Sequence, residues 1–459
     1  MNLFTRTLLL FVAVFSFKVQ AQNIDITTEL SKIEGLRFTQ IASANPAYKI
    51  FEMFYRQPVN HKNPDGPSFK QKLILWHRDE VRPMVLQTSG YAIFSVGLSA
   101  LASEFTANQI QVEHRFFQTS IPVNPDWSYL NIEESAGDFH RITVALKSIY
   151  KAKWVNTGRS KGGMTSMYHR YFYPNDLDAT VAHVAPHSYS TDDMRYAEFV
   201  SNAIGGEQNA ECRAKLVASQ RVLLANTADI ATRIGEGTFN LLGSKEIAIE
   251  HALLEMPWSF WQYSGPGESC DNVPAESAPI DEHLSFLFAN NDPNGYNDEG
   301  LSGFVPYYYQ AATQLGSPGT TLSNLADLLN FADTFNIFTY IPKDIPATYD
   351  NAKAMHQVSD WIKHSSEKIL YVYGDWDPWS GGAYEPRTDG DSYRFYVPKT
   401  NHSAQFINLS GEARDLAYMK LSRWLNVDRP VETQSPPNAR KAKTLEDIEF
   451  EALRKLRVR

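Results

Sequence analysis

The apolar and polar residues of this chain follow two different periods over most of its length. Runs of mainly apolar and β-branched residues predict strands, and apolar residues at every third or fourth position predict helices. Strands are predicted at 48–60, 69–77, 84–88, 109–113, from 154, and at 179–185, 369–374 and 393–397. Helices are predicted at 98–105, 133–150, after 160, and at 412–425. Because strands and helices alternate, the pattern predicts an α/β fold with a mostly parallel sheet.

One long segment interrupts this alternation. Helical spacing dominates at 212–225, 244–254 and 322–331, and aromatic residues cluster at 258–263 and 307–309. We therefore predict a helical cap at 190–366, inserted between the two parts of an α/β core and covering the C-terminal edge of its sheet. The predicted core comprises 22–189 and 367–426. The polar residues 427–459 are expected to form a C-terminal tail, with 444–459 as a short exposed helix or a frayed end.

A serine between two glycines follows the strand that begins at residue 154. Gly158, Ser160 and Gly162 have the spacing G-x-S-x-G, and residues with helical character come next. A serine hydroxyl attacks a carbonyl only when a sharp turn exposes it beside a base and oxyanion donors. The order of strand, turn and helix is typical of a nucleophile elbow, although the same glycine spacing also occurs in ordinary turns.

Two acids and a histidine follow this serine in the order that its chemistry requires. Asp375 and Asp377 come directly after one predicted strand, and His402 lies after the next. In the α/β-hydrolase fold the triad acid and then the histidine follow the serine. Each of these residues alone fits an ordinary loop, but their joint order favours a serine hydrolase. We predict Asp377 as the triad acid because Pro378 fixes its loop, with Asp375 as the alternative.

The oxyanion hole of such an enzyme requires two N–H donors. One belongs to the residue after the nucleophile, which is Lys161. The other comes from the loop after an earlier central strand, and Ser89, Gly90 and Tyr91 follow the strand predicted at 84–88. We predict the backbone N–H groups of Lys161 and Tyr91, with a plain strand-to-helix connection as the alternative for Tyr91.

The length and composition of the chain indicate its number of domains and its cellular compartment. With 459 residues, 43% hydrophobic and 21% charged, the chain can bury a large core in one to three domains. Arg6, an apolar run at 8–17 and Ala21 predict a signal peptide at 1–21 and an exported protein, in the periplasm or outside the cell. The run is too short for a permanent membrane span. Cleavage shifts the formal net charge from −9 to about −11, which argues against nucleic acid as a partner.

The cysteines and histidines suggest no metal and no other cofactor. Cys212 and Cys270 are the only two cysteines, and in an exported protein they form either one disulfide or two free thiols. His183 and His187 are four residues apart, but they lie on and after a predicted strand, where that spacing does not create a helical metal face. We therefore predict a hydrolase without a metal.

Four motifs resemble one family of serine peptidases. They are VEHRFF at 112–117, GRSKGGMT at 158–165, SFWQY at 259–263 and GDWDPWS at 374–380. Together they are similar to the secreted tripeptidyl and prolyl tri/tetrapeptidyl aminopeptidases, and two of them also to the lysosomal Pro-X carboxypeptidase and dipeptidyl peptidase II group. The resemblance extends over 48–424. It implies an α/β-hydrolase with a helical cap that releases short peptides from free N-termini, often after proline, through Ser160, Asp377 and His402. Arg159 departs from the small residue expected before the nucleophile, which leaves the fine substrate preference open.

An aminopeptidase must also bind the ammonium group of its peptide substrate, and a carboxylate at a fixed distance from the serine suits this task. Glu113 is our hypothesis, with an ion pair to Arg115 or a helix cap as the alternative. Trp258, Phe260 and Trp261 are predicted to line the substrate pocket, although aromatic residues in a cap also form its core.

Two other functions fit the same fold. An esterase or lipase uses the same triad, and turnover of peptide anilides against acyl esters separates these classes. A binding protein on a hydrolase fold is the third alternative, because fold does not determine function. An intact Ser160, Asp377 and His402 argue against it, since a binding protein needs none of the three.

Overall fold

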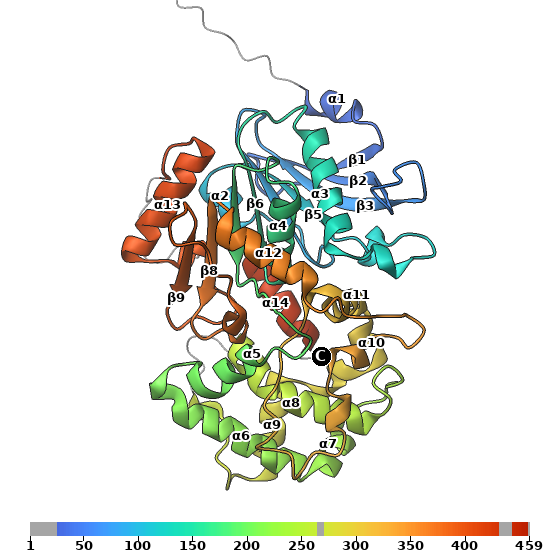
Figure 1. The fold of residues 1–459 in the computed structure, drawn as a ribbon, viewed down its shortest axis with the longest axis vertical. Helices are drawn as coiled ribbons and strands as arrows, with labels where there is room; N and C mark the ends of the chain where they lie inside the picture. The colour runs from blue at the N-terminus through green and yellow to red at the C-terminus, as the bar shows by residue number, and fades with distance from the viewer. Residues whose placement is uncertain (1–24, 264–269, 431–442, 458–459) are drawn as a thin grey trace, which may run out of the picture.

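A nine-stranded sheet forms the centre of the core in the computed structural model, which describes residues 25–263, 270–430 and 443–457 (Figure 1). The predicted signal peptide at 1–21 lies outside the described residues. The strand order is β1-β2-β3-β5-β4-β6-β7-β8-β9. The strands are β1 (Leu36–Ile41), β2 (Lys49–Pro58), β3 (Ser68–His77), β4 (Met84–Thr88), β5 (Asn108–Val112), β6 (Trp154–Arg159), β7 (Ala179–His183), β8 (Ile369–Gly374) and β9 (Tyr393–Val397).

The sheet is antiparallel at one side and parallel over the rest. Strands β1, β2, β3 and β5 pair antiparallel, and every pair from β5 through β4, β6, β7 and β8 to β9 is parallel. All residues of β4, β5, β6, β7 and β8 are buried, as expected for strands whose sheet is covered on both faces. The prediction of an α/β-hydrolase fold with a mostly parallel sheet is confirmed, although the edge strand β1 was missed in the sequence.

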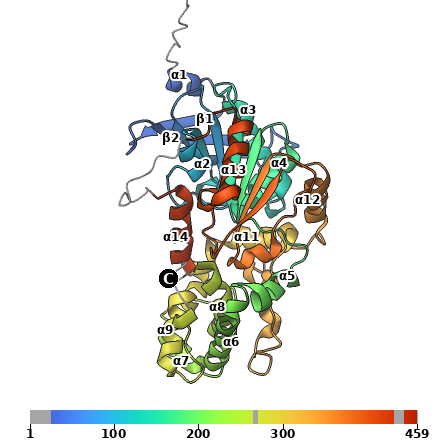
Figure 2. The ribbon, with the colours of Figure 1, turned by 90° about the vertical axis from the view of Figure 1, so that its left-hand side faces the viewer.

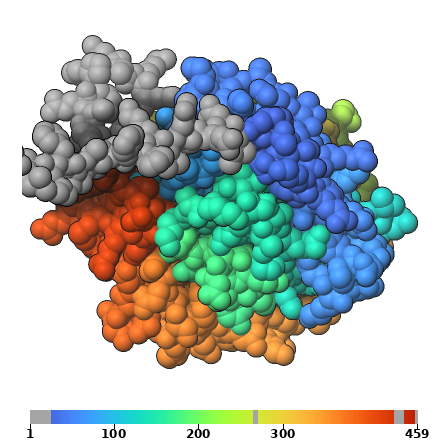
Figure 3. Space-filling model, turned by 90° about the horizontal axis from the view of Figure 1, so that it is seen from above, coloured from blue at the N-terminus to red at the C-terminus, as the bar shows by residue number. Residues whose placement is uncertain are grey.

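Helices cover both faces of the sheet. Helices α2 and α13 pack with Val85 on one face, and α1 and α3 pack with Met84 and Leu86 on the other, where α4 and α12 form the adjoining cluster. Seen from above, N-terminal residues (blue) and residues near the C-terminal end of the core (orange-red) lie on either side of the residues coloured teal (Figure 3). These helices are α1 (Ile26–Ser31), α2 (Ala100–Glu104), α3 (Ile132–Leu146), α4 (Lys161–Phe172), α12 (Lys353–His364) and α13 (Gly411–Leu425).

Besides α12, seven α-helices of the described residues lie between β7 and β8 in the sequence, and most of them gather at one end of the molecule (Figures 1 and 2). They enclose an apolar core of their own, built around residues such as Leu216, Leu253 and Leu287. The helix predicted at 322–331 is replaced by turns, because apolar residues three apart pack equally well from successive turns. The seven helices are α5 (Met194–Glu198), α6 (Ala210–Leu224), α7 (Thr227–Arg233), α8 (Lys245–Tyr263), α9 (Ile280–Asn290), α10 (Asp298–Ser302) and α11 (Val305–Gln310).

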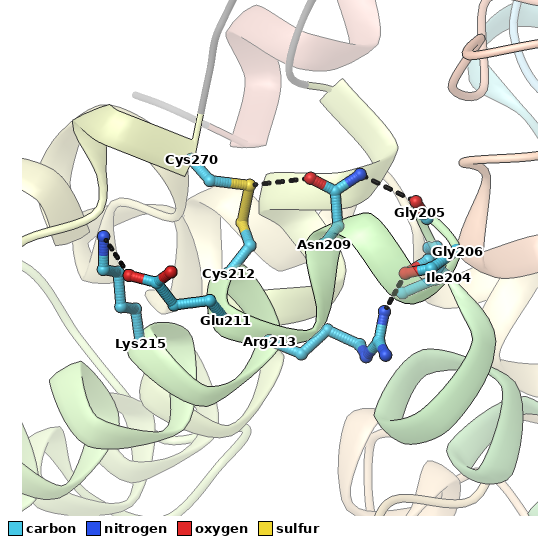
Figure 4. Close-up of a disulfide and its surroundings, with 9 residues drawn as sticks. All are labelled: Ile204, Gly205, Gly206, Asn209, Glu211, Cys212, Arg213, Lys215 and Cys270. Carbon is cyan, nitrogen blue, oxygen red and sulfur yellow. Dashed lines mark hydrogen bonds and ion pairs between the residues drawn. A yellow bond between two sulfur atoms is a disulfide. The ribbon is translucent and has the colours of Figure 1, made fainter.

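The two cysteines form a disulfide within this helical region. Cys212 in α6 and Cys270 have their Cα atoms 5.2 Å apart and close a loop across 58 residues (Figure 4). Beside the bridge, Asn209 Nδ2 donates to the Gly205 carbonyl, and Arg213 donates to the carbonyl groups of Ile204 and Gly206. The bridge therefore fastens the start of α6 to the segment that leads to α9.

The C-terminal end of the chain differs from the expected exposed or frayed tail. Helix α14 (Leu445–Arg457) packs against the core, with Leu445 and Glu446 fully buried. The Leu445 N–H donates to the Leu98 carbonyl, and the Ala100 N–H donates to the Glu446 carboxylate. The alternating charges suggested solvent exposure, but one face of this helix is buried by partners more than 300 positions earlier in the chain.

Candidate active site

Ser160 stands at a strained turn between β6 and α4. Its backbone has φ 53° and ψ −126°, which a residue with a side chain rarely adopts, and its N–H donates to the His183 carbonyl at 2.9 Å. A Cβ added to Gly158 would lie 2.4 Å from the backbone of Gly162, and one added to Gly162 would lie 2.4 Å from the Thr88 carbonyl oxygen. The two glycines of the motif are therefore required for the close packing of the turn.

His402 and Asp377 form a buried hydrogen-bonded pair. His402 Nδ1 lies 2.8 Å from Asp377 Oδ2, and the two residues are 2% and 0% exposed. The other oxygen of Asp377 accepts the Trp379 N–H at 3.1 Å. A carboxylate only accepts hydrogen bonds, so Nδ1 carries the ring proton and Nε2 has the lone pair that a general base needs. The backbone N–H of His402 donates to the Gln262 carbonyl at the end of α8.

Asp375 has a different environment. It is half-buried, and its Oδ1 accepts the Thr400 N–H at 3.3 Å, which connects the loop after β8 with the loop that leads to His402. Burial raises the pKa of the Asp375 carboxyl group above its ordinary value. Of the two aspartates that the sequence left open, the structure pairs Asp377 with His402 and gives Asp375 a bracing contact.

The loop of the two predicted oxyanion residues packs directly on the elbow. Gly90 has φ +73°, and a Cβ there would lie 2.4 Å from the Gly162 nitrogen and 2.6 Å from the Lys161 carbonyl carbon. Thr88 Oγ1 donates to the Gly162 carbonyl oxygen at 2.6 Å. Because Lys161 is the first residue of α4, its N–H has no carbonyl one turn earlier in the helix. The loop that contains Tyr91 therefore packs directly against the turn that contains Lys161.

The predicted ammonium-binding role of Glu113 is contradicted by its surroundings. Glu113 is fully buried, and its carboxylate accepts hydrogen bonds from the Ile93 N–H and from the hydroxyl groups of Thr119 and Ser120. Arg115, the alternative partner, pairs instead with Asp138 at 2.7 Å. Glu113 therefore organises the end of β5, and the carboxylate has no open side for a substrate.

The three aromatic residues proposed for the pocket have different positions. Phe260 is buried in the apolar core of the helical region and is not among the residues that line the adjoining cavity, so its assignment to the pocket was wrong. Trp258 and Trp261 both line this cavity, which has a volume of about 930 Å³. Tyr307, Tyr308, Tyr340 and Trp379 contribute further rings to its wall, and Asp192, Glu207 and Glu255 contribute carboxylates.

Trp379 connects this cavity to the catalytic pair. Its ring centroid lies 5.0 Å from Trp258 and 6.2 Å from His402. Ser160 and His402 do not line the cavity, whereas Trp379 lines it and adjoins His402. The sequence analysis quoted Trp379 only as part of a motif, and its place directly after Asp377 and Pro378 was the signal that it belongs to the site.

Helix α14 also reaches the elbow, which no sequence signal indicated. Arg159, the residue before Ser160, is buried, and its guanidinium lies 5.3 Å from the ring centre of Phe450. Arg159 Nη2 donates to the Ser403 carbonyl at 3.3 Å, and Gln405 Nε2 donates to Asp447. The last helix therefore contacts both the nucleophile strand and the loop of His402.

Because Glu449 on this helix is buried, we expect the stability of the folded chain to depend on pH. Burial, and to a lesser degree the neighbouring Glu446, raise the pKa of the Glu449 carboxyl group to about 8. Between its ordinary value and pH 8 the folded chain holds a proton that the unfolded chain has lost, so this group lowers the stability as the pH rises. The substitution Glu449→Gln is expected to flatten this slope and to raise the Tm at pH 9 by a few degrees.

Thermal unfolding of both proteins between pH 5 and pH 9 checks this expectation. Glu451→Gln is the matched control, because Glu451 lies on the same helix but pairs with Lys443 at the surface. Parallel Tm curves for wild type and Glu449→Gln would show that Glu449 titrates normally.

Within the described residues, no group of three or more histidine, cysteine or acidic side chains is arranged to hold a metal ion. The search of the same residues for a helix long and apolar enough to cross a membrane found none.

This chain is similar in sequence or in fold to several known proteins. The model of the PS-10 peptidase S37 family matches residues 19–454. A prolyl tri/tetrapeptidyl aminopeptidase of Streptomyces mobaraensis is 38% identical over 423 residues, which cover 89% of this chain and 87% of that protein. Among solved structures, the proline iminopeptidase of Mycobacterium smegmatis is 13% identical with a TM-score of 0.40, covering 85% of this chain and 99% of its own. Feruloyl esterase B of Aspergillus oryzae is 14% identical with a TM-score of 0.37, and the match covers 87% of this chain and 90% of the esterase.

Proposed function

This chain belongs to the PS-10 peptidase S37 family, and we propose that it releases tri- and tetrapeptides from free N-termini by cleavage after proline. The chain is a serine peptidase of the aminopeptidase type. The observation that supports this site is the buried, hydrogen-bonded pair of His402 and Asp377, which in our proposal forms a triad with the strained Ser160. The preference for proline rests on the similarity to the Streptomyces enzyme.

The proposed mechanism uses only groups of this chain. His402 Nε2 takes the proton of Ser160, whose Oγ attacks the peptide carbonyl carbon. The N–H groups of Tyr91 and Lys161 hold the oxyanion, and Asp377 orients the imidazole and stabilises its charged form. His402 then gives the proton to the leaving amine, and a water molecule releases the acyl group from Ser160.

The cavity beside Trp379 is our proposed binding site for the residues that are released. Its wall is rich in aromatic rings, and the flat faces of Trp258 and Trp379 suit a proline ring or another apolar side chain. The carboxylates of Asp192, Glu207 and Glu255 give the wall the sign of charge that an ammonium group requires.

Export is part of the same proposal. The apolar run at 8–17 and Ala21 support a signal peptide, and the disulfide between Cys212 and Cys270 is typical of an oxidising compartment.

Hydrolysis of a tripeptide anilide that ends in proline tests this function directly. The wild type is expected to cleave the anilide with a free N-terminus at least tenfold faster, in kcat/KM, than the same compound with a blocked N-terminus. Short acyl esters are assayed in parallel, and the Ser160→Ala enzyme shows whether a contaminating peptidase contributes. Cleavage of neither anilide, with rapid turnover of the esters, would replace the peptidase function with that of an esterase.

A further inference from the structure

Lys161 carries a buried amine next to the nucleophile. Only 2% of this residue is exposed, and burial lowers the pKa of its amine well below the ordinary value. The amine lies 5.6 Å from the ring centre of Tyr91 and 5.3 Å from that of Phe117. An apolar side chain of the same length would fill this space without the cost of desolvation. The polar contact of the amine therefore calls for a role of its own.

That contact is with the oxyanion loop. Lys161 Nζ donates a hydrogen bond to the Gly90 carbonyl oxygen at 2.6 Å, across 71 positions of sequence. This carbonyl belongs to the peptide unit that also contains the Tyr91 N–H. In a trans peptide the C=O and N–H bonds point in opposite directions. Fixing the Gly90 oxygen on the side of Lys161 therefore directs the Tyr91 N–H to the other side.

The neighbouring backbone groups fix the rest of this loop. The Tyr91 carbonyl accepts the His114 N–H at 3.0 Å, and the Ser89 N–H donates to the Val112 carbonyl at 3.2 Å. The Gly90–Tyr91 peptide is thus left with one rotation, about the ψ bond of Gly90 and the φ bond of Tyr91. The hydrogen bond from Lys161 selects one orientation of this peptide.

We propose that the side chain of Lys161 is a positioning group that aims the Tyr91 N–H at the oxyanion. In this arrangement one residue contributes twice, because its backbone N–H is one donor and its amine orients the second. The proposal rests on the oxyanion hole assigned under the proposed function. A neutral amine still donates a hydrogen bond, so the contact does not require a charged lysine.

The substitution Lys161→Met tests this role because it keeps the length and removes the donor. A mispositioned oxyanion donor is expected to lower kcat by roughly 30- to 300-fold, with KM changed less than threefold. The Kd of a peptide aldehyde, whose adduct with Ser160 places an oxygen in the oxyanion hole, should rise by a similar factor. The Kd of the corresponding peptide alcohol, which forms no adduct, should stay within threefold.

Two further variants make the test independent of folding. Phe117→Leu removes one ring from the amine but keeps the hydrogen bond to Gly90, and it is expected to retain kcat within threefold. Lys161→Gln keeps a donor on a shorter side chain and replaces Lys161→Met if the latter does not fold. In that case Lys161→Gln must lower kcat and the affinity for the aldehyde, and leave the affinity for the alcohol unchanged. A kcat within threefold of wild type for the folded variant, or equal losses for aldehyde and alcohol, would overturn the proposal.

The same comparison separates this proposal from the proposed function. It is made on whichever acyl substrate the wild type hydrolyses best. Failure of the wild type to cleave peptides would refute the peptidase specificity, whereas the effect of Lys161→Met on ester turnover would still decide the role of its amine.

Discussion

Replacement of Ser160 by alanine is expected to lower kcat by about a million-fold, to the level that binding and the oxyanion donors alone provide. The alanine variant keeps the backbone and loses only the attacking oxygen. Since the Ser160 N–H, and not its side chain, forms the hydrogen bond to His183, the Tm should change little. Active-site titration with a fluorophosphonate and mass spectrometry of the labelled peptide measure the same property, because wild type takes up one label on Ser160 and the variant none. Retention of more than one per cent of wild-type kcat would move the nucleophile to another residue.

Replacement of Asp377 by asparagine should produce the second largest loss, about ten-thousand-fold in kcat. An amide in place of the carboxylate presents an N–H or a weaker acceptor to His402 Nδ1, so the imidazole loses the tautomer that leaves Nε2 as a base. The short contact between Asp377 and His402 is buried, so water cannot replace the lost acceptor.

Asp375→Asn is the matched control for this substitution, since it lies two residues earlier on the same loop. Its carboxylate accepts the Thr400 N–H, and an amide oxygen can do the same. We expect its kcat to stay within about tenfold of wild type. If Asp375→Asn abolishes turnover while Asp377→Asn retains it, the acid of the triad has been assigned to the wrong residue.

The sequence was most informative where local chemistry and chain order agree. Ser160, Asp377 and His402 could be proposed because an elbow has a fixed spacing of glycines and because each partner follows a predicted strand. The choice between Asp375 and Asp377 could not be made with the same certainty. Both lie in one short loop, and which carboxylate reaches the imidazole depends on the turn at Pro378 and on the Trp379 N–H.

The predictions that failed concern contacts between segments distant in the sequence. Glu113 follows a strand at the expected edge, but the nearby sequence does not indicate that Thr119, Ser120 and Ile93 donate hydrogen bonds to its buried carboxylate. Phe260 and Trp261 are adjacent, and only the packing of α8 shows that Trp261 lines the cavity and Phe260 does not. Helix α14 was misjudged because Glu446 and Glu449 suggest a solvated face, and their burial beside Arg159 depends on the folded core.

The position of α14 sets an order in which the molecule can be assembled. A chain is made from its N-terminus, and the strand and turn of Ser160 emerge long before the residues that pack against Arg159 and the loop of His402. The Ala100 N–H gains its hydrogen-bond acceptor only when Glu446, 346 positions later, has been made. A nascent chain that has just reached His402 therefore carries Ser160, Asp377 and His402 without these bracing contacts, which form only after α14 has been made. Truncation before α14 would yield a product with all three proposed triad residues and an unfinished site.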